Sequence, residues 1–486
     1  MPRPTAYGPG AGGADGAGTF RAEPGGGHEI EHDHGNDHEG QDEGRFEGEQ
    51  RVEAAGRPSR SSPVRTLLIT GPGGAGRTTV AAASALAEAR NGRRTLLLSG
   101  EPPAVLAPLL GVPQPAAREA TGASGALPVQ EGPAEVPATE GRLWVARIDA
   151  GAQFRSGGRA LQERIRPALG MVGAEALDED ELTELPGAEA FALLRTLRAA
   201  HAVEAWDTLV VDLPPTPAAL QLLALPSQLR RYLRRLLPPE RQAARALRPA
   251  LAQLVGVPMP TAALYETTAR WDGELAAVEE MLESPGTSVR LVAEPGTLPA
   301  EALRLARAGA GLYGLPLAAV VANRLLPMES SDPWLRGLSG RQRDVLAALR
   351  EECEAQDVPL LEVPHLGRDP LGVEDLERVA RAAGLPGAVA DAAGSGRRAG
   401  AGEVENRIAS EGLLVWHLPL PAVRKGELDL VRRGDELILS AGPYRRVLTL
   451  PSALRRCRVA GAALERGVLR VRCEPDPALW PEEPKG

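Results

Sequence analysis

The 486-residue sequence predicts an α/β protein with a doubly wound parallel sheet, followed by a small all-β sandwich. Short apolar runs alternate with helix-length segments between residues 65 and 385. Residues 411–474 instead alternate apolar and polar side chains with a period of two, which is typical of strands that are buried on one face. Hydrophobic residues make up 43% of the chain and aromatic residues only 3%, so we expect cores of Ala, Leu and Val.

The first 62 residues are predicted to form a disordered acidic tail. They are rich in Gly, Asp, Glu and His and contain hardly any bulky apolar side chains that would offset the entropy of ordering. His28, His32, His34 and His38 lie among carboxylates there, which suits either loose binding of a transition metal or a solvated tail. Their spacing matches no defined metal site, and this favours the solvated tail.

Seven apolar runs in the following region are expected to be the parallel strands. They are residues 64–70, 94–99, 143–149, 207–215, 289–294, 318–324 and 359–364. This gives a domain over residues 63–385, a Gly/Ala-rich linker over 386–410, a β-sandwich over 411–474 and a tail over 475–486. In such a parallel sheet, ligands bind beyond the carboxyl ends of the strands.

A glycine-rich loop follows the first strand and precedes a helix that is expected to begin near Arg77. Its residues are Gly71, Pro72, Gly73, Gly74, Ala75, Gly76, Arg77, Thr78 and Thr79. Glycines allow successive backbone N–H groups to point at one anion, and the helix adds the positive end of its dipole. The loop therefore predicts a phosphate site, although Arg77 stands where such loops usually carry lysine.

Two oxygen ligands for Mg²⁺ are expected beside this loop. Thr78 occupies the position at which a hydroxyl ligates the ion, and Asp212 ends an apolar strand at the position of the carboxylate that holds it, directly or through water. A strand, loop and helix together with a later strand that ends in Asp indicate a nucleotide site far more specifically than a lone glycine-rich turn.

Composition excludes several other classes of function. The net charge of −9 and the lack of basic clusters argue against nucleic-acid binding. Cys353, Cys457 and Cys473 are scattered and form no CxxC pair, so neither a disulfide framework nor a zinc site is indicated and a reducing cytoplasm is the natural setting. The chain shows no leader-like start and no long apolar run, so no direct membrane span is expected.

The loop GPGGAGRTT resembles the GKGGVGKTT loop of the ArsA and Get-type ATPases, which serve metalloid efflux and tail-anchored protein targeting. Five further segments agree in the family's order, among them SGEPPAVLAPLLG at 99–111, which resembles switch I, and DLPPTPAALQLLALP at 212–226, which resembles switch II. The resemblance covers about residues 65–385 and implies a P-loop NTPase fold that binds ATP with Mg²⁺. It also implies that Asn323, in the segment VVANRLLP, reads the adenine base.

The sequence departs from the family pattern at residues that would bind the phosphates and catalyse hydrolysis. The two loop lysines of the family are replaced here by Pro72 and Arg77. A planar guanidinium does not substitute conservatively for a compact ammonium, so nucleotide binding should weaken. Glu101 aligns with the switch I Asp that activates the attacking water and is the candidate catalytic base. Pro217 stands where the family has a flexible residue in switch II, which predicts impaired sensing of the γ-phosphate.

The C-terminal strands LPLPAVRKGELDLVRRGDELIL resemble the α-crystallin-like domain at the end of bacterial ArsA-type proteins. Small heat-shock proteins use this fold to hold clients. The resemblance further implies a homodimer, since each chain has one P-loop and the family pairs two such halves. We therefore expect a cytoplasmic protein with a degenerate P-loop and weak ATP hydrolysis that handles a protein client or a membrane partner.

Two alternatives remain open at this stage. One is a catalytically silent scaffold or holdase that keeps the fold for assembly. The other is the soluble ATPase subunit of an anion or metalloid pump, although the cysteines that bind metalloid in that family are missing from the corresponding segments.

Overall fold

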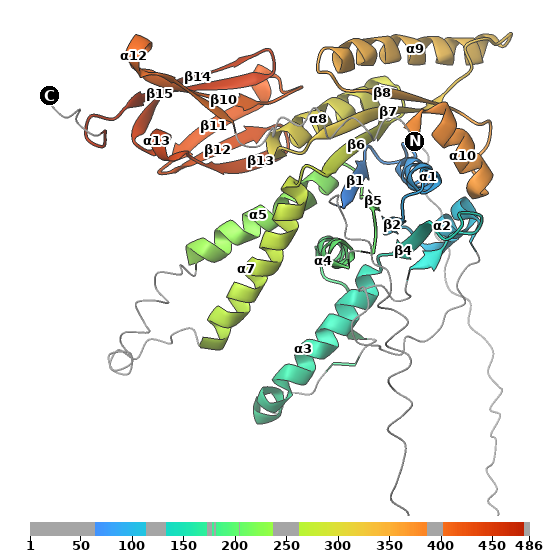
Figure 1. Ribbon diagram of the computed structural model, residues 1–486, viewed down its shortest axis with the longest axis horizontal. Helices are drawn as coiled ribbons and strands as arrows, with labels where there is room; N and C mark the ends of the chain where they lie inside the picture. Colours follow the sequence, from blue (N-terminus) through green and yellow to red (C-terminus); the bar gives the residue numbers. More distant parts are fainter. Residues whose placement is uncertain are drawn as a thin grey trace, which may run out of the picture. The chain divides into compact units, whose positions relative to one another are not determined.

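The computed structural model describes residues 64–112, 133–172, 177–178, 181–203, 205–236, 262–385 and 402–480 (Figure 1). The expected His-containing tail lies outside these residues. None of the helices in the described part of the chain is long and apolar enough to cross a membrane.

An eight-stranded sheet forms the centre of the larger domain, in the order β3-β4-β2-β5-β1-β6-β7-β8. Its strands are β1 (Arg65–Thr70), β2 (Thr95–Ser99), β3 (Ala134–Glu135), β4 (Leu143–Arg147), β5 (Thr208–Asp212), β6 (Thr287–Ala293), β7 (Leu317–Leu325) and β8 (Leu360–Pro364). All neighbours pair in parallel except β3, which pairs antiparallel with β4. The predicted doubly wound α/β fold is confirmed, with β3 as an added edge strand.

Helices cover both faces of this sheet (Figure 1). They are α1 (Arg77–Arg90), α2 (Pro103–Leu110), α3 (Ala150–Val172), α4 (Ala188–Ala202), α5 (Ala218–Leu236), α7 (Ala262–Glu283), α8 (Thr297–Tyr313), α9 (Pro333–Glu354) and α10 (Gly372–Ala382). Because successive strand side chains point to opposite faces, Leu67 and Ile69 pack toward α1, α2 and α10, whereas Leu68 packs in the core that contains α4, α5, α7 and α8. Both faces of the strands are therefore buried, which explains their continuous apolar runs.

The C-terminal domain consists of two antiparallel sheets, as predicted. One sheet has the order β14-β15-β10-β9 and the other has the order β11-β12-β13. Its elements are β9 (Glu403–Arg407), α12 (Ile408–Glu411), β10 (Leu413–Pro419), the 3-10 turn η3 (Lys425–Glu427), β11 (Leu428–Arg433), β12 (Glu436–Ala441), β13 (Tyr444–Thr449), α13 (Ser452–Arg455), β14 (Cys457–Glu465) and β15 (Val468–Pro475).

Two features differ from the sequence expectation. β9 and α12 lie within residues 386–410, which were expected to be linker, because β9 pairs with β10 across residues 403–407. Glu405 in this strand also bonds His417 of β10 at 2.9 Å, which gives His417 a structural partner. Polar side chains dominate β9, so its sequence carries little of the apolar alternation by which a strand is recognised.

The β-domain packs against α8 and α5 of the larger domain. Tyr444 of β13 is only 2% exposed and meets Tyr313 edge to face, with 5.9 Å between ring centroids. A Cβ atom on Gly309 of α8 would lie 2.7 Å from the Tyr444 ring, so only glycine permits this close approach. The apolar core on this face of the sheet consequently continues into the β-domain.

Candidate functional site

The glycine-rich loop connects the end of β1 to the start of α1. Gly74 and Gly76 have φ angles of 78° and 83°, a region that favours glycine. A Cβ atom on Gly76 would lie 2.3 Å from Asn323 Nδ2, and one on Gly71 would lie 1.9 Å from the Val292 carbonyl oxygen. The loop therefore depends on glycine both for its backbone conformation and for its close contact with β6 and β7.

The end of β7 braces the same loop. Asn323 is 5% exposed, and its Nδ2 donates to the Ala75 carbonyl oxygen at 2.8 Å. Arg324 Nη1 donates to the Gly74 carbonyl oxygen, also at 2.8 Å. Both bonds are accepted by carbonyl groups of the loop and use none of its N–H groups, of which that of Ala75 donates to the Pro72 carbonyl oxygen at 3.4 Å. The sequence resemblance assigned Asn323 to recognition of the base. It did not predict the hydrogen bond from Arg324 to the Gly74 carbonyl oxygen.

Asp212 lies at the carboxyl end of β5 beside the loop. Its Oδ2 accepts a hydrogen bond from Ser99 Oγ at 2.8 Å, and the Thr78 side chain also bonds the carboxylate. Oδ1 is buried and has no hydrogen-bond partner among the described residues. Burial raises the pKa of Asp212, an effect that the bonds to Ser99 and Thr78 only partly offset.

Arg77 lies beside the end of β5 and lines the same cavity as Asp212. It is half-buried, and its Nη1 donates to the carbonyl oxygen of Leu213, at the start of the segment that follows Asp212. The guanidinium thus ties the first residue of α1 to the strand end that carries the candidate magnesium ligand. It remains close enough to Asp212 for its charge to lower the pKa of that carboxyl, against the larger effect of burial.

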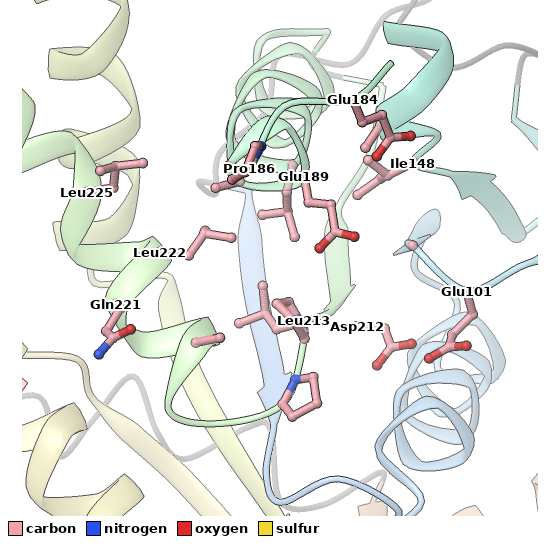
Figure 2. Close-up of a pocket in the computed structure, with 18 of the residues that line it drawn as sticks. Glu101, Ile148, Glu184, Pro186, Glu189, Asp212, Leu213, Gln221, Leu222 and Leu225 are labelled. Carbon is pink, nitrogen blue, oxygen red and sulfur yellow. The ribbon is translucent and has the colours of Figure 1, made fainter. Parts of the chain in front are cut away.

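A cavity of about 1130 Å³ opens beside these groups (Figure 2). Arg77, Glu101 and Asp212 line it at one end, where the carboxylates of Glu101 and Asp212 lie near each other. The charge of Glu101 contributes to the raised pKa of Asp212. The Glu101 backbone N–H bonds Ser99 Oγ at 3.2 Å, so the same serine holds both carboxylate-bearing residues.

A second cavity, of about 240 Å³, is lined by residues at the start of α1 and the end of β7. Thr78, Thr79 and Asn323 line it together with Arg324 and with residues from Val363, near the end of β8, to Leu371. Residues at the start of α1 therefore line both cavities, one together with Glu101 and Asp212 and the other together with Asn323.

Comparison with known protein families agrees with this geometry. The anion-transporting ATPase family (ArsA type) matches residues 64–383. The chain belongs to this family. The HSP20-like domain found in ArsA proteins matches residues 411–472, in agreement with the predicted α-crystallin-like domain.

Several relatives of this ArsA-family chain cover most of its length. A protein of Streptomyces coelicolor, named as uncharacterized, is 53% identical over 419 residues, which is 86% of this chain and 99% of the relative. A protein of Aquifex aeolicus, provisionally named as an arsenical pump-driving ATPase, is 25% identical over 84% of this chain and 99% of its own length. The ATPase GET3B of Arabidopsis thaliana is 27% identical over 64% of this chain and 76% of its own length.

The structure brings the sequence-predicted site residues of this ArsA-family chain to one place. The loop residues 71–79, Glu101, Asp212 and Asn323 all meet at the carboxyl ends of β1, β2, β5 and β7. Sequence reasoning missed Ser99 and Arg324. The signal was available for Ser99, a hydroxyl at the end of a buried strand, whereas the Arg324 contact depends on how the end of β7 lies against the loop in the folded chain.

Proposed function

We propose that this ArsA-family protein binds ATP with Mg²⁺ at the loop of residues 71–79 and hydrolyses it slowly. The observation that carries the proposal is the buried Asp212 Oδ1, which has no hydrogen-bond partner in the described part of the chain. A lone buried carboxylate oxygen is costly, and a magnesium ion or one of its bound waters would supply the missing interaction. Thr78 already bonds the same carboxylate and would hold the ion as well.

This residue set fits magnesium better than a transition metal. No group of three or more His, Cys, Asp or Glu side chains in the described residues is arranged to hold a metal ion. Magnesium in nucleotide sites needs no such group, because it is held by one or two protein oxygens, the substrate phosphates and water. Bound magnesium would neutralise charge on the terminal phosphates, while the protein supplies Thr78 and Asp212.

Weak hydrolysis follows from Arg77 and Glu101. Arg77 holds the Leu213 carbonyl oxygen, and a guanidinium is a wide fork rather than a compact charge, so it is poorly placed to follow the terminal phosphates. Glu101 lines the cavity beside Asp212 and would accept a proton from the attacking water. Its side chain is one methylene longer than that of aspartate, and small misplacements of such a group are costly in rate.

ATP binding and hydrolysis would serve to handle a protein client or a membrane partner. Apolar side chains of α4 and α5, among them Leu193, Leu222 and Leu225, line the large cavity next to Glu101 and Asp212. We further propose a homodimer, because each chain supplies one P-loop and the family pairs two such halves. The GET3B name of one relative and the HSP20-like domain support a client-related role.

A scaffold or holdase without catalysis is the second candidate, and the Arg77 contact with Leu213 favours it, because this contact occupies the side chain that would bind phosphate.

A metalloid-pump subunit is less well supported. Cys353 is on α9 and Cys457 and Cys473 are on β14 and β15; all three are buried, and burial raises each thiol pKa, which disfavours the thiolate that binds metalloid.

Aggregation of a heat-denatured reporter enzyme distinguishes these candidates. We expect the purified protein to suppress aggregation to different extents with Mg·ATP and without nucleotide. Equal suppression in both conditions would support the holdase instead. Phosphate release that arsenite stimulates would identify the pump subunit, and Cys353→Ser is the matched control for an effect of arsenite through that thiol.

A further inference from the structure

Helix α5 leads directly from the candidate nucleotide site to the β-domain. It begins at Ala218, within the segment 212–226 that resembles switch II and directly after its non-helical residues Leu213 to Pro217. Its first half lines the large cavity through Ala218, Gln221, Leu222 and Leu225 (Figure 2). Any displacement of α5 would therefore move switch II, which contains the Leu213 carbonyl oxygen that Arg77 bonds.

The β-domain forms an ion pair with the second half of this helix. Arg231 of α5 donates from Nε and Nη2 to Oε1 and Oε2 of Glu436 in β12, with both distances 2.7 Å. Such a bidentate pair fixes orientation as well as distance. The hydrogen bonds from Arg231 also lower the pKa of Glu436, so the pair stays charged at neutral pH.

On its other side, α5 is held by α7. Arg230 bonds Asp272 Oδ1 at 3.1 Å and also pairs with Glu279. Adjacent arginines on α5 thus point to different partners, one within the ATPase domain and one in the β-domain. Loss of the Glu436 contact would leave α5 anchored to α7 alone through this pair of arginines.

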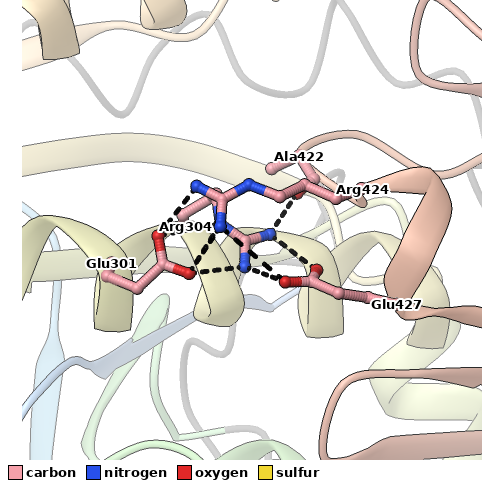
Figure 3. A network of polar contacts seen from close by, with 5 residues as sticks. All are labelled: Glu301, Arg304, Ala422, Arg424 and Glu427. Carbon is pink, nitrogen blue, oxygen red and sulfur yellow. Dashed lines mark hydrogen bonds and ion pairs between the residues drawn. The ribbon is translucent and has the colours of Figure 1, made fainter.

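A second ion-pair cluster joins the β-domain to α8 (Figure 3). Arg304 of α8 donates to Glu427 through Nη1 at 3.0 Å and Nη2 at 2.6 Å and also bonds the Ala422 carbonyl oxygen at 2.7 Å. Arg424 reaches back to Glu301 at 2.9 and 3.0 Å. This cluster joins the same domain to α8 and contains no residue of α5, so it provides an internal comparison, although α8 also packs against α5.

We propose that the β-domain acts as a positioning element for switch II, with Arg231 and Glu436 as the positioning residues. The bidentate pair holds α5 at the orientation in which Leu213 to Pro215 line the cavity beside Arg77, Glu101 and Asp212. The inference rests on the proposed function, because it assigns the β-domain a role in recognition of the terminal phosphate of ATP. Neither residue would touch the nucleotide.

The test measures ATP and ADP affinity for full-length wild type, Glu436→Gln and Glu427→Gln by calorimetry with Mg²⁺. The two glutamates are matched, with side chains 26% and 28% exposed and each paired with two arginines. Glu436→Gln is expected to weaken ATP binding by about three- to tenfold, the range of modest coupling between sites, while ADP affinity stays within about twofold. Glu427→Gln should leave both affinities unchanged.

A double-mutant cycle separates positioning from general loss of stability. Arg231→Gln should weaken ATP binding as Glu436→Gln does, and the double variant should add nothing further. Unchanged ATP affinity in Glu436→Gln, or equal losses in Glu436→Gln and Glu427→Gln, would overturn the inference. Wild-type protein that binds neither nucleotide would overturn the proposed function itself and this inference with it.

Discussion

Arg77 is the residue at which the loop departs most clearly from a standard phosphate site. Its guanidinium donates a hydrogen bond to the Leu213 carbonyl oxygen. We expect Arg77→Lys to raise ATP turnover, on the order of tenfold, because a compact ammonium can reach the terminal phosphates. Phosphate release at saturating Mg·ATP measures the effect. Unchanged or lower turnover would show that the arginine is adapted to this site.

The Asp212 carboxylate is expected to lower the stability of the nucleotide-free protein while it supports nucleotide binding. Because burial raises its pKa, the carboxylate destabilises the nucleotide-free fold. Asp212→Asn should therefore raise the unfolding free energy at neutral pH, by about 1 kcal/mol or more, and remove the Mg²⁺ dependence of ATP binding. Thermal unfolding and ATP titration with and without Mg²⁺ test both effects. A less stable variant that still responds to Mg²⁺ would contradict the assignment.

The raised pKa of Asp212 also predicts how stability and Mg²⁺-dependent ATP affinity change with pH. The stability contributed by protonated Asp212 is fully present below the ordinary aspartate pKa and is lost as pH rises through the raised value. Magnesium needs the ionised form, so Mg²⁺-dependent ATP affinity should fall as pH drops through that value. Affinity titrations at a series of acidic pH values measure this, and Asp212→Asn is the control that should show no such fall.

At the scale of elements, the glycine-rich loop offers a matched pair of substitutions. Gly76 has φ of 83° and a blocked Cβ position, whereas a Cβ atom on Gly73 meets nothing within 4 Å. Gly76→Ala should lower the unfolding free energy by about 1 to 3 kcal/mol, and Gly73→Ala by less than about 0.5 kcal/mol. Urea unfolding compares the two variants, and equal effects would argue against the strained loop geometry.

The sequence predicted most elements, because their physical signals are local. Buried parallel strands read as apolar runs, and the glycine-rich loop between β1 and α1 has its own pattern. Short or polar strands such as β3 and β9 escaped, since their pairing depends on distant partners. Arg290 is a further case. It is fully buried in β6 and bonds Ser84 of α1 at 2.7 Å, which no periodicity in its own strand indicates.

For the whole molecule, the apolar core that runs from the central sheet into the β-domain predicts cooperative unfolding. Scanning calorimetry of the wild type should show one transition for both domains. Tyr444→Ala, which empties the contact with Gly309, should cost about 3 to 5 kcal/mol and separate the transition into two. Tyr232 is 52% exposed, so Tyr232→Ala should leave a single transition. Two transitions in the wild type would contradict this account.

The docking of the β-domain could not be predicted from sequence, although both domains could. Each domain carries its own periodicity, but the contacts between them depend on side chains far apart in the chain, such as Arg231 with Glu436 and Arg304 with Glu427. The same holds for the site. Gly71 to Thr79 and Asp212 were found from local patterns, whereas the contact of Arg77 with Leu213 requires the folded geometry.

The central claim is that the loop still binds ATP with Mg²⁺ and hydrolyses it slowly. The most direct measurement titrates the purified protein with a fluorescent ATP analogue, with and without Mg²⁺, and then follows phosphate release on the same sample. We predict Mg²⁺-dependent binding and slow turnover that falls further in Glu101→Gln. Failure to bind the analogue in either condition would contradict the account and leave the glycine-rich loop as a structural element of a scaffold.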